Sequence, residues 1–135
     1  MDKKTDRDTK LDSVPKRILL VEDDDSLANV YTMRLQSEGF DIRRVDNGED
    51  ALSAALSYKP DMVLLDIMLP KVSGFDVLDI LRHTPETAKL KIIVMTALSQ
   101  ESDKERADQL GADEYLVKSQ IVIADVVDRI RKLIK

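Results

Sequence analysis

Residues 63–70 read Val63-Leu64-Leu65-Asp66-Ile67-Met68-Leu69-Pro70, and this stretch is the clearest indication of the fold. Its three leading aliphatic residues predict a strand that is buried on both faces, with Asp66 at the point where the strand ends. Three other short apolar runs end in polar residues, namely Glu22-Asp23, Thr96 and Lys118. This repetition predicts a parallel sheet with polar side chains gathered along one edge.

Five apolar runs have the length and composition of buried strands, at residues 17–22, 40–45, 61–65, 91–95 and 115–117. An amphipathic stretch follows each of them and predicts a helix. The first helix contains Leu27 to Leu35, the second covers residues 48–58, the third starts after Gly74, and the last two cover residues 99–110 and 123–134. Five strand-helix units with right-handed crossovers give an α/β fold, a three-layer α/β/α sandwich around a five-stranded parallel sheet.

The apolar spacing also predicts which helix faces are buried. The first helix is expected to bury Leu27, Val30, Tyr31 and Leu35. The second is expected to bury Ala51, Leu52, Ala55 and Leu56. The helix at residues 99–110 is mostly polar, so we expect it to pack weakly on the sheet. The last helix has the strongest amphipathic pattern, formed by Ile123, Val126, Val127, Ile130 and Ile134.

The chain has 135 residues, of which 43% are hydrophobic and 35% charged, as in a folded single domain. Residues 1–15 are polar and aperiodic, so we interpret them as a flexible arm or a cloning remnant, with the domain at residues 16–135. No apolar run approaches the roughly 20 residues that span a bilayer. The charged start lacks the apolar stretch of a signal peptide, so we expect a cytoplasmic protein without membrane contact.

Charge and cysteine content exclude several classes of function. The chain has no cysteine, which removes disulfides, thiolate nucleophiles and thiolate metal sites. Its formal net charge is −5, and residues 18–135 hold 15 basic against 22 acidic side chains. Such a domain would repel a phosphate backbone, so we expect no direct nucleic-acid contact. The four glycines lack phosphate-loop spacing, which argues against nucleotide-binding folds.

The four strand ends together supply the parts of a phosphoryl-transfer site. Carboxylates crowded at one edge repel each other unless a cation neutralises them, and Mg²⁺ prefers such oxygen ligands. A carboxylate such as Asp66 can attack phosphorus to form an acyl phosphate. A hydroxyl such as that of Thr96 and an ammonium such as that of Lys118 can stabilise the charge of the transferred group.

In order and spacing, the motifs resemble those of the receiver domain of bacterial response regulators, the phosphoacceptor half of two-component signalling. The resemblance covers about residues 16–135 and rests on Ile18-Leu19-Leu20-Val21-Glu22-Asp23-Asp24, Val63-Leu64-Leu65-Asp66-Ile67-Met68-Leu69-Pro70 with Ser73-Gly74, Ile93-Val94-Met95-Thr96-Ala97 and Gly111-Ala112-Asp113-Glu114-Tyr115-Leu116-Val117-Lys118. It implies a flavodoxin-like fold with strand order 2-1-3-4-5.

The resemblance also implies a metal site. Asp66 matches the family's phosphoacceptor, and Asp23 matches the direct ligand of Mg²⁺, for which Mn²⁺ is an alternative. Glu22 would hold metal-bound water, and the backbone carbonyl of Met68 would complete the protein ligands.

By the same resemblance, Thr96 and Lys118 contact the phosphoryl group, and Tyr115 turns inward when Thr96 shifts. The output surface would be the fourth helix, fifth strand and fifth helix. The family usually has proline after this lysine, often with a cis peptide, whereas Ser119 follows Lys118 here. The loop must therefore either accept a cis bond or present Lys118 differently, and Ser119 could cap the last helix.

Other residues have simpler interpretations. We expect Asp24 and Asp25 to favour the start of the first helix, and His83 to be solvated at a helix end. The basic residues Arg129, Arg131, Lys132 and Lys135 suit the end of the last helix. In the family, the positions of Met68 and Leu98 flank the route of hydrolytic water, and both are apolar here. We therefore expect slow self-dephosphorylation.

The leading hypothesis is a signalling switch, not an enzyme with a separate substrate. A histidine kinase or phosphotransfer protein would phosphorylate Asp66, and a changed surface would bind a downstream effector. A homodimer through the last helix in the phosphorylated state is part of the same hypothesis. The alternative is a non-phosphorylated interaction module. A phosphatase is less favoured, because Met68 cannot handle a leaving group.

Overall fold

The computed structural model describes residues 14–134. The predicted arm at residues 1–15 lies almost wholly outside this range, as does Lys135, and the domain boundary at residue 16 stays a prediction. The strands are β1 (Arg17–Val21), β2 (Asp41–Val45), β3 (Met62–Leu65), β4 (Lys91–Thr96) and β5 (Glu114–Val117). The helices are α2 (Asp25–Ser37), α3 (Gly48–Ser57), α4 (Gly74–Arg82), α5 (Glu101–Gln109), α6 (Ile123–Leu133) and the short 3₁₀ turn η1 (Lys118–Gln120).

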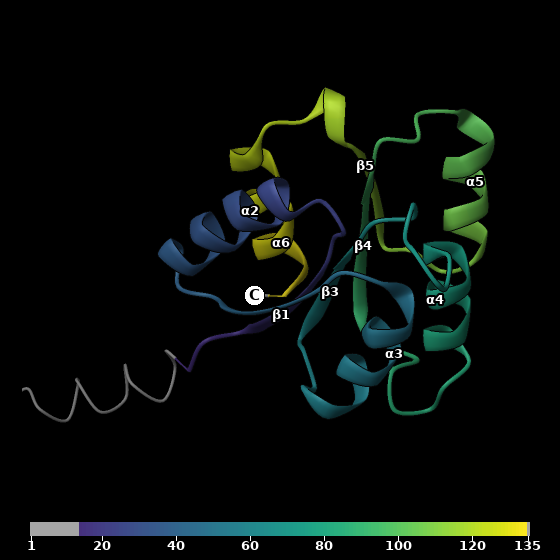
Figure 1. Cartoon of the computed structure of the whole chain (residues 1–135), viewed down its shortest axis with the longest axis horizontal. Coiled ribbons are helices and arrows are strands. Elements are labelled where there is room, and N and C mark those ends of the chain that lie inside the picture. Colours follow the sequence, from purple (N-terminus) through teal and green to yellow (C-terminus); the bar gives the residue numbers. More distant parts are fainter. Residues whose placement is uncertain (1–13, 135) are drawn as a thin grey trace, which may run out of the picture.

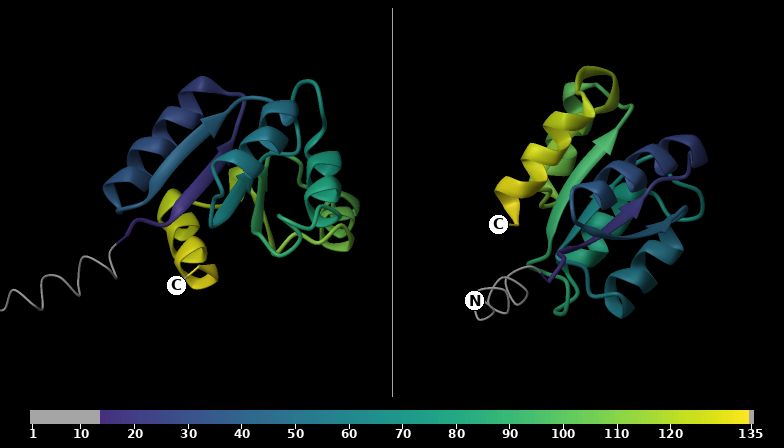
Figure 2. Two further views of the ribbon diagram at one scale, coloured as in Figure 1. Left: turned by 90° about the horizontal axis from the view of Figure 1, so that it is seen from below. Right: turned by 90° about the vertical axis from the view of Figure 1, so that its left-hand side faces the viewer.

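The five strands form one parallel sheet in the order β2-β1-β3-β4-β5, which confirms the predicted topology. Helices α2 and α6 lie on one face, and α3, α4 and α5 lie on the other (Figure 1). The turned views in Figure 2 show the same three layers. The predicted α/β/α sandwich is therefore confirmed.

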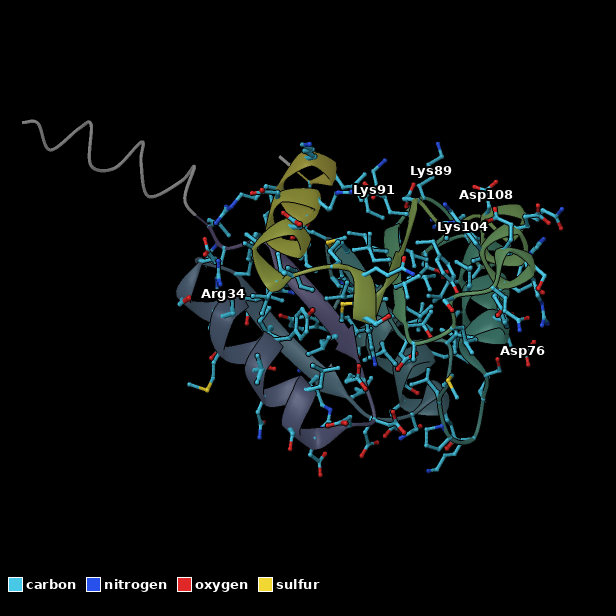
Figure 3. The ribbon with its side chains drawn as sticks, turned by 90° about the horizontal axis from the view of Figure 1, so that it is seen from above. Arg34, Asp76, Lys89, Lys91, Lys104 and Asp108 are labelled. Carbon is cyan, nitrogen blue, oxygen red and sulfur yellow. The ribbon has the colours of Figure 1, made fainter. Side chains whose placement is uncertain are left out.

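Alternate residues of the central strands feed two separate cores, because successive side chains in a strand point to opposite faces. In β1, Leu19 and Val21 pack toward α3 and α4, whereas Ile18 and Leu20 pack toward α2 and α6. All four are at most 1% exposed. This double burial explains why the strands read as continuous apolar runs. Charged side chains such as Asp76 and Lys89 point outward (Figure 3).

Two predictions of buried helix residues are wrong. Val30 is 55% exposed and Leu56 is 47% exposed. Helix α2 buries the narrow stripe Ala28, Tyr31 and Leu35, and α3 buries Ala51, Ala54 and Ala55. Val30 and Leu56 each lie one position to the side of these stripes, a rotation of about 100° around a helix. On both helices the stripe of apolar residues is thus wider than the stripe of buried residues.

The predicted weak packing of α5 is confirmed, because Ala107 is its one buried residue. The prediction that Ser119 caps the last helix is wrong. Ser119 lies inside η1, and α6 begins four residues later with Val122 at the cap position and no side-chain cap. Burial of Val126, Val127 and Ile130 against the sheet sets where this helix runs. No helix between residues 14 and 134 is long and apolar enough to cross a membrane.

Candidate functional site

Three acidic side chains meet at the carboxyl ends of β1 and β3. These strands are paired, with Val21 opposite Leu65, so the residues that follow them lie side by side. Carboxylate oxygens of Glu22, Asp23 and Asp66 all lie within 4.8 Å of one another. Glu22 and Asp66 are buried, and Asp23 is exposed. The structure therefore brings together the three carboxylates that the sequence assigned to a metal site.

Lys118 reaches into this cluster from the end of β5. Its Nζ lies 2.8 Å from Oδ2 of Asp66 and 2.7 Å from Oε1 of Glu22. No peptide bond among residues 14–134 is cis, so the bond between Lys118 and Ser119 is trans. Replacement of the usual proline by Ser119 therefore does not keep the lysine from Asp66.

Burial and the lysine act on the ionisation of these groups in opposite directions. Burial raises the pKa of Glu22 above its usual value, and the contact with Lys118 and the hydrogen bond from the Asp24 N–H offset this only partly. Burial lowers the pKa of Lys118, but its hydrogen bond to Asp66 and its ion pair with Glu22 outweigh burial and raise that pKa. Lys118 is therefore an ammonium at neutral pH, and burial disfavours the ionised form of Glu22.

The backbone around Asp66 is closely packed. The Asp66 N–H donates to the Val21 carbonyl at 3.1 Å, and the Met68 N–H donates to Oδ1 of Asp66 at 3.1 Å. A Cβ on Gly74 would lie 2.3 Å from the Asp66 carbonyl oxygen, so this position requires glycine. These contacts hold the phosphoacceptor candidate in one position at the strand end.

Thr96 and Tyr115 are connected through one loop residue. Thr96 is fully buried at the end of β4, in register with Val117. The Leu98 N–H donates a long hydrogen bond of 3.4 Å to the Thr96 hydroxyl oxygen, and the Tyr115 hydroxyl donates to the Leu98 carbonyl at 2.7 Å. Burial, with the nearby charges of Asp103 and Asp66, raises the pKa of Tyr115 to about 12. A shift of Thr96 therefore has a physical route to Tyr115.

The neighbouring residues have structural roles. Asp24 caps α2 by accepting from the Leu27 N–H at 3.0 Å, as the helix-start interpretation predicts. His83 is exposed at the end of α4 beside Asp79. Arg44 of β2 also lies at this edge, where its Nε–H donates to the Glu22 carbonyl. The sequence gives no sign of this contact, because Arg44 binds the main-chain carbonyl of Glu22 and every residue type has such a carbonyl.

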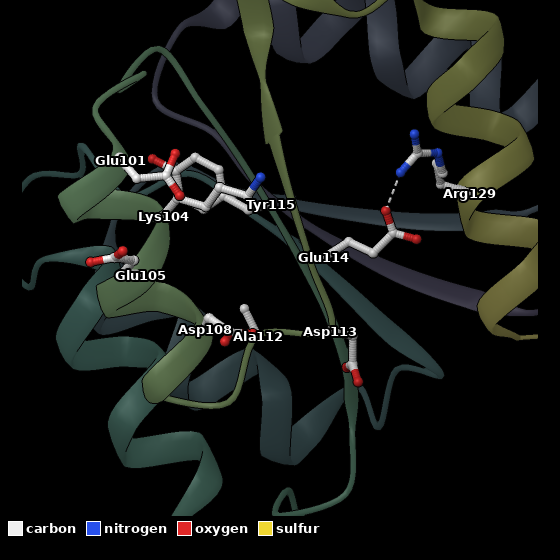
Figure 4. Close-up of a pocket in the computed structure, with 9 residues that line it drawn as sticks. All are labelled: Glu101, Lys104, Glu105, Asp108, Ala112, Asp113, Glu114, Tyr115 and Arg129. Atoms are coloured by element: carbon white, nitrogen blue, oxygen red, sulfur yellow. Dashed lines mark hydrogen bonds and ion pairs between the residues drawn. The ribbon is translucent and has the colours of Figure 1, made fainter.

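A groove of about 510 Å³ lies on the surface formed by α5, β5 and α6. Figure 4 shows Glu101 and Lys104 of α5 close to Tyr115, and an ion pair between Glu114 of β5 and Arg129 of α6. Tyr115 thus lines this groove while its hydroxyl donates to the carbonyl of Leu98, the residue that is also bonded to Thr96.

Fold and site together define a doubly wound α/β protein with a cluster of acidic side chains at the carboxyl ends of its strands, where such folds bind their ligands. The family model for the response regulator receiver domain matches residues 18–131. The chain therefore belongs to the response regulator receiver domain family, as its motifs indicated.

Named relatives agree with this assignment. The DNA-binding response regulator MtrA of Mycolicibacterium smegmatis is 38% identical over 125 residues, covering 90% of this chain and 54% of that protein. The DNA-binding dual master transcriptional regulator RpaA of Synechocystis is 34% identical over 119 residues, covering 88% and 49%. The chain thus spans about half the length of these relatives. Both names describe DNA-binding proteins, so they give no support to the expectation that the protein makes no nucleic-acid contact.

One of the similar solved structures contains a metal ion. It is the receiver domain of the sensor histidine kinase PA1611 of Pseudomonas aeruginosa, described with a magnesium ion coordinated in the active site cleft. It is 28% identical, has a TM-score of 0.82, and the match covers 90% of this chain and 98% of that one.

Proposed function

We propose that the chain is a phosphorylation-activated switch in which Asp66 accepts a phosphoryl group from a histidine kinase or a phosphotransfer protein. The observation that carries the proposal is the contact of Lys118 with Asp66 inside a cluster of three carboxylates. An Asp66 carboxylate oxygen forms a bond to phosphorus while the bond from phosphorus to the donor imidazole breaks, which leaves an acyl phosphate on Asp66.

The residues present fit a hard divalent cation. All the donors are oxygen atoms, and three carboxylates within 4.8 Å carry more negative charge than Lys118 can neutralise. Asp23 and Asp66 would bind Mg²⁺ directly, Glu22 would do so through water, and the carbonyl of Met68 would complete the protein ligands. Mn²⁺ has the same ligand preferences and is an alternative. When bound, the cation neutralises charge on the incoming phosphoryl group.

Lys118 and Thr96 have separate roles in this proposal. The ammonium of Lys118 already contacts Asp66 and stabilises negative charge on the transferred group. The Thr96 hydroxyl oxygen accepts a long hydrogen bond from the Leu98 N–H, and its own proton would be donated to a phosphoryl oxygen. A shift of Thr96 toward that oxygen would strain its bond with Leu98 and, through Leu98, disturb Tyr115 on the surface.

We further propose that the output surface is the one formed by α5, β5 and α6. Helix α5 is attached by little apolar burial, so its position can change at low cost. A downstream effector protein would bind this surface in the phosphorylated state, and a phosphorylated homodimer through α6 is part of the proposal. The domain would span residues 16–135 and act in the cytoplasm.

The test is the intact mass of the protein after incubation with Mg²⁺ and a small acyl phosphate. We expect one added phosphoryl group, and none in Asp66→Asn or with a chelator. The matched control is Asp61→Asn. The Asp61 carboxylate accepts from the Arg17 N–H at the other end of the sheet, so this variant should be phosphorylated as the wild type is. Failure of the wild type to take phosphoryl or to bind Mg²⁺ would favour the non-phosphorylated interaction module.

A further inference from the structure

Arg44 connects β2 to both ends of the loop that carries the acidic pair. It lies in register with Leu20 of β1, and its side chain is 25% exposed. Its Nε–H donates to the Glu22 carbonyl at 2.8 Å, and a terminal nitrogen lies 2.9 Å from Oδ1 of Asp25. The second contact is an ion pair rather than an aligned hydrogen bond. One guanidinium therefore contacts the residue before Asp23 and the first residue of α2.

The two main-chain groups of Glu22 are both bonded to β2. Its N–H donates to the Val45 carbonyl at 3.1 Å, and its carbonyl accepts from Arg44. That carbonyl belongs to the peptide plane that joins Glu22 to Asp23. Because Arg44 holds this plane, rotation about the bonds on either side of it is restrained, and so are the directions in which the two side chains leave the backbone.

The cluster needs such a restraint. Three carboxylates within 4.8 Å repel one another, and the loop from β1 to α2 could relieve the repulsion by moving away from β3. Lys118 opposes the repulsion by contacting two carboxylates directly. Arg44 forms no hydrogen bond or ion pair with the three cluster carboxylates in the part of the chain that the structure describes. Its contribution is made through the loop that carries two of them.

We propose that Arg44 is a positioning residue for the divalent cation, which fixes the peptide between Glu22 and Asp23 so that both carboxylates face the ion. The inference rests on the cation site of the proposed function. Lysine cannot replace it, because one ammonium on a flexible stem does not reproduce a planar fork that contacts two groups in fixed directions.

If Arg44 acted only through its charge, its removal would change the affinity for Mg²⁺ in the opposite direction. A positive charge near a cation site weakens cation binding, so removing the charge of Arg44 would then strengthen the binding of Mg²⁺. A positioning role predicts weaker binding when either the charge or the fork is lost. The two roles are therefore distinguished by the direction of one change in affinity.

The experiment is a calorimetric titration with Mg²⁺ of the full chain and of the variants Arg44→Met, Arg44→Lys and Arg43→Met. Arg43→Met is the matched control, because it removes the same charge from the same strand. The Arg43 guanidinium stacks on the Tyr58 ring. We expect binding about tenfold weaker in Arg44→Met, several-fold weaker in Arg44→Lys and unchanged in Arg43→Met. The Mg²⁺ concentration that half-saturates Asp66 phosphorylation should rise in parallel, with little change in the rate at saturation.

Each other outcome is decisive. Equal or tighter binding in Arg44→Met, or wild-type binding in Arg44→Lys, overturns the positioning role. Should Arg44→Met fail to fold, the charge-preserving Arg44→Lys carries the test. Absence of Mg²⁺ binding in the wild type would instead overturn the cation site of the proposed function.

Discussion

Glu38 and Glu22 carry the same carboxyl group at opposite ends of the sheet. Glu38 follows α2 at the amino ends of the strands and accepts hydrogen bonds from Arg131 at 2.9 Å and Arg34 at 3.0 Å. These bonds lower the pKa of Glu38. At the carboxyl ends, burial raises the pKa of Glu22. Hydrogen bonds thus favour the ionised form of Glu38 at one end of the molecule, and burial disfavours the ionised form of Glu22 at the other.

The arginines of the amino end show the same contrast. Arg82 of α4 donates to the carbonyls of Gly111 and Leu90 and to the carboxylate of Asp113, which joins α4 to the starts of β4 and β5. At the carboxyl end three carboxylates lie within 4.8 Å of one another, and Lys118 contacts two of them. Charged side chains at the amino end of the sheet therefore join secondary-structure elements, whereas the carboxyl end has excess negative charge that a cation can neutralise.

The largest expected effect is that of Lys118→Met at the carboxyl end. It removes the ammonium that contacts Asp66 and Glu22. We expect phosphorylation of Asp66 by a small acyl phosphate to slow about a hundredfold at saturating Mg²⁺, because a donor to the transferred group is lost. Mg²⁺ itself should bind at least as tightly as before. A rate equal to that of the wild type would remove Lys118 from the chemistry.

The matching change at the amino end is Arg82→Met. It removes the donor to the carbonyls of Gly111, Ala88 and Leu90 and the ion pair with Asp113, so we expect the free energy of unfolding to fall by about 2 kcal/mol. Urea unfolding measures this loss. Phosphorylation of the folded fraction should stay normal, and slower phosphorylation would show that the two ends are coupled.

A smaller effect is expected on the lifetime of the phosphoryl group. Met68 is exposed two residues after Asp66 and cannot orient water by hydrogen bonding. We expect Met68→Asn or Leu98→Glu to shorten the half-life of the phosphorylated protein several-fold, as followed by intact mass. Met33, an exposed methionine of α2, is the control, and Met33→Asn should leave the half-life unchanged. Rapid loss of phosphoryl that neither substitution alters would contradict this expectation.

The smallest effects are opposite pH dependences of the two glutamates. The folded pKa of Glu22 lies above 4.5, so its contribution to the unfolding free energy falls as the pH rises through that pKa. The folded pKa of Glu38 lies below 4.5, so its contribution is present above 4.5 and is lost as the pH falls through the folded value.

At pH 7 Glu22→Gln should therefore raise the free energy of unfolding, and Glu38→Gln should lower it. Both differences from the wild type should shrink in urea unfolding below pH 4.5. Two variants that change stability in the same direction would contradict the contrast between the ends.

The sequence could predict the carboxyl end well for a simple physical reason. The ends of neighbouring parallel strands must meet, so Glu22, Asp23 and Asp66 could be placed together from the apolar runs that precede them. The contact of Lys118 with this cluster follows from the same rule, although its trans bond to Ser119 could not be predicted.

Other features depend on packing that no local pattern encodes. Val30 and Leu56 have the right spacing for burial, but their exposure depends on how each helix is rotated on the sheet. Ser119 has a side chain suited to capping, but α6 starts where its buried face meets the core. Arg44 binds a main-chain carbonyl, which any residue at position 22 would offer.

The most direct test of the excess charge at the carboxyl end is the free energy of unfolding with and without Mg²⁺, at matched ionic strength. We expect Mg²⁺ at about tenfold its Kd to stabilise the wild type by about 1.4 kcal/mol, because the ion binds only the folded cluster. Asp23→Asn should show little of this gain. Equal stability of the wild type with and without Mg²⁺ would contradict the account.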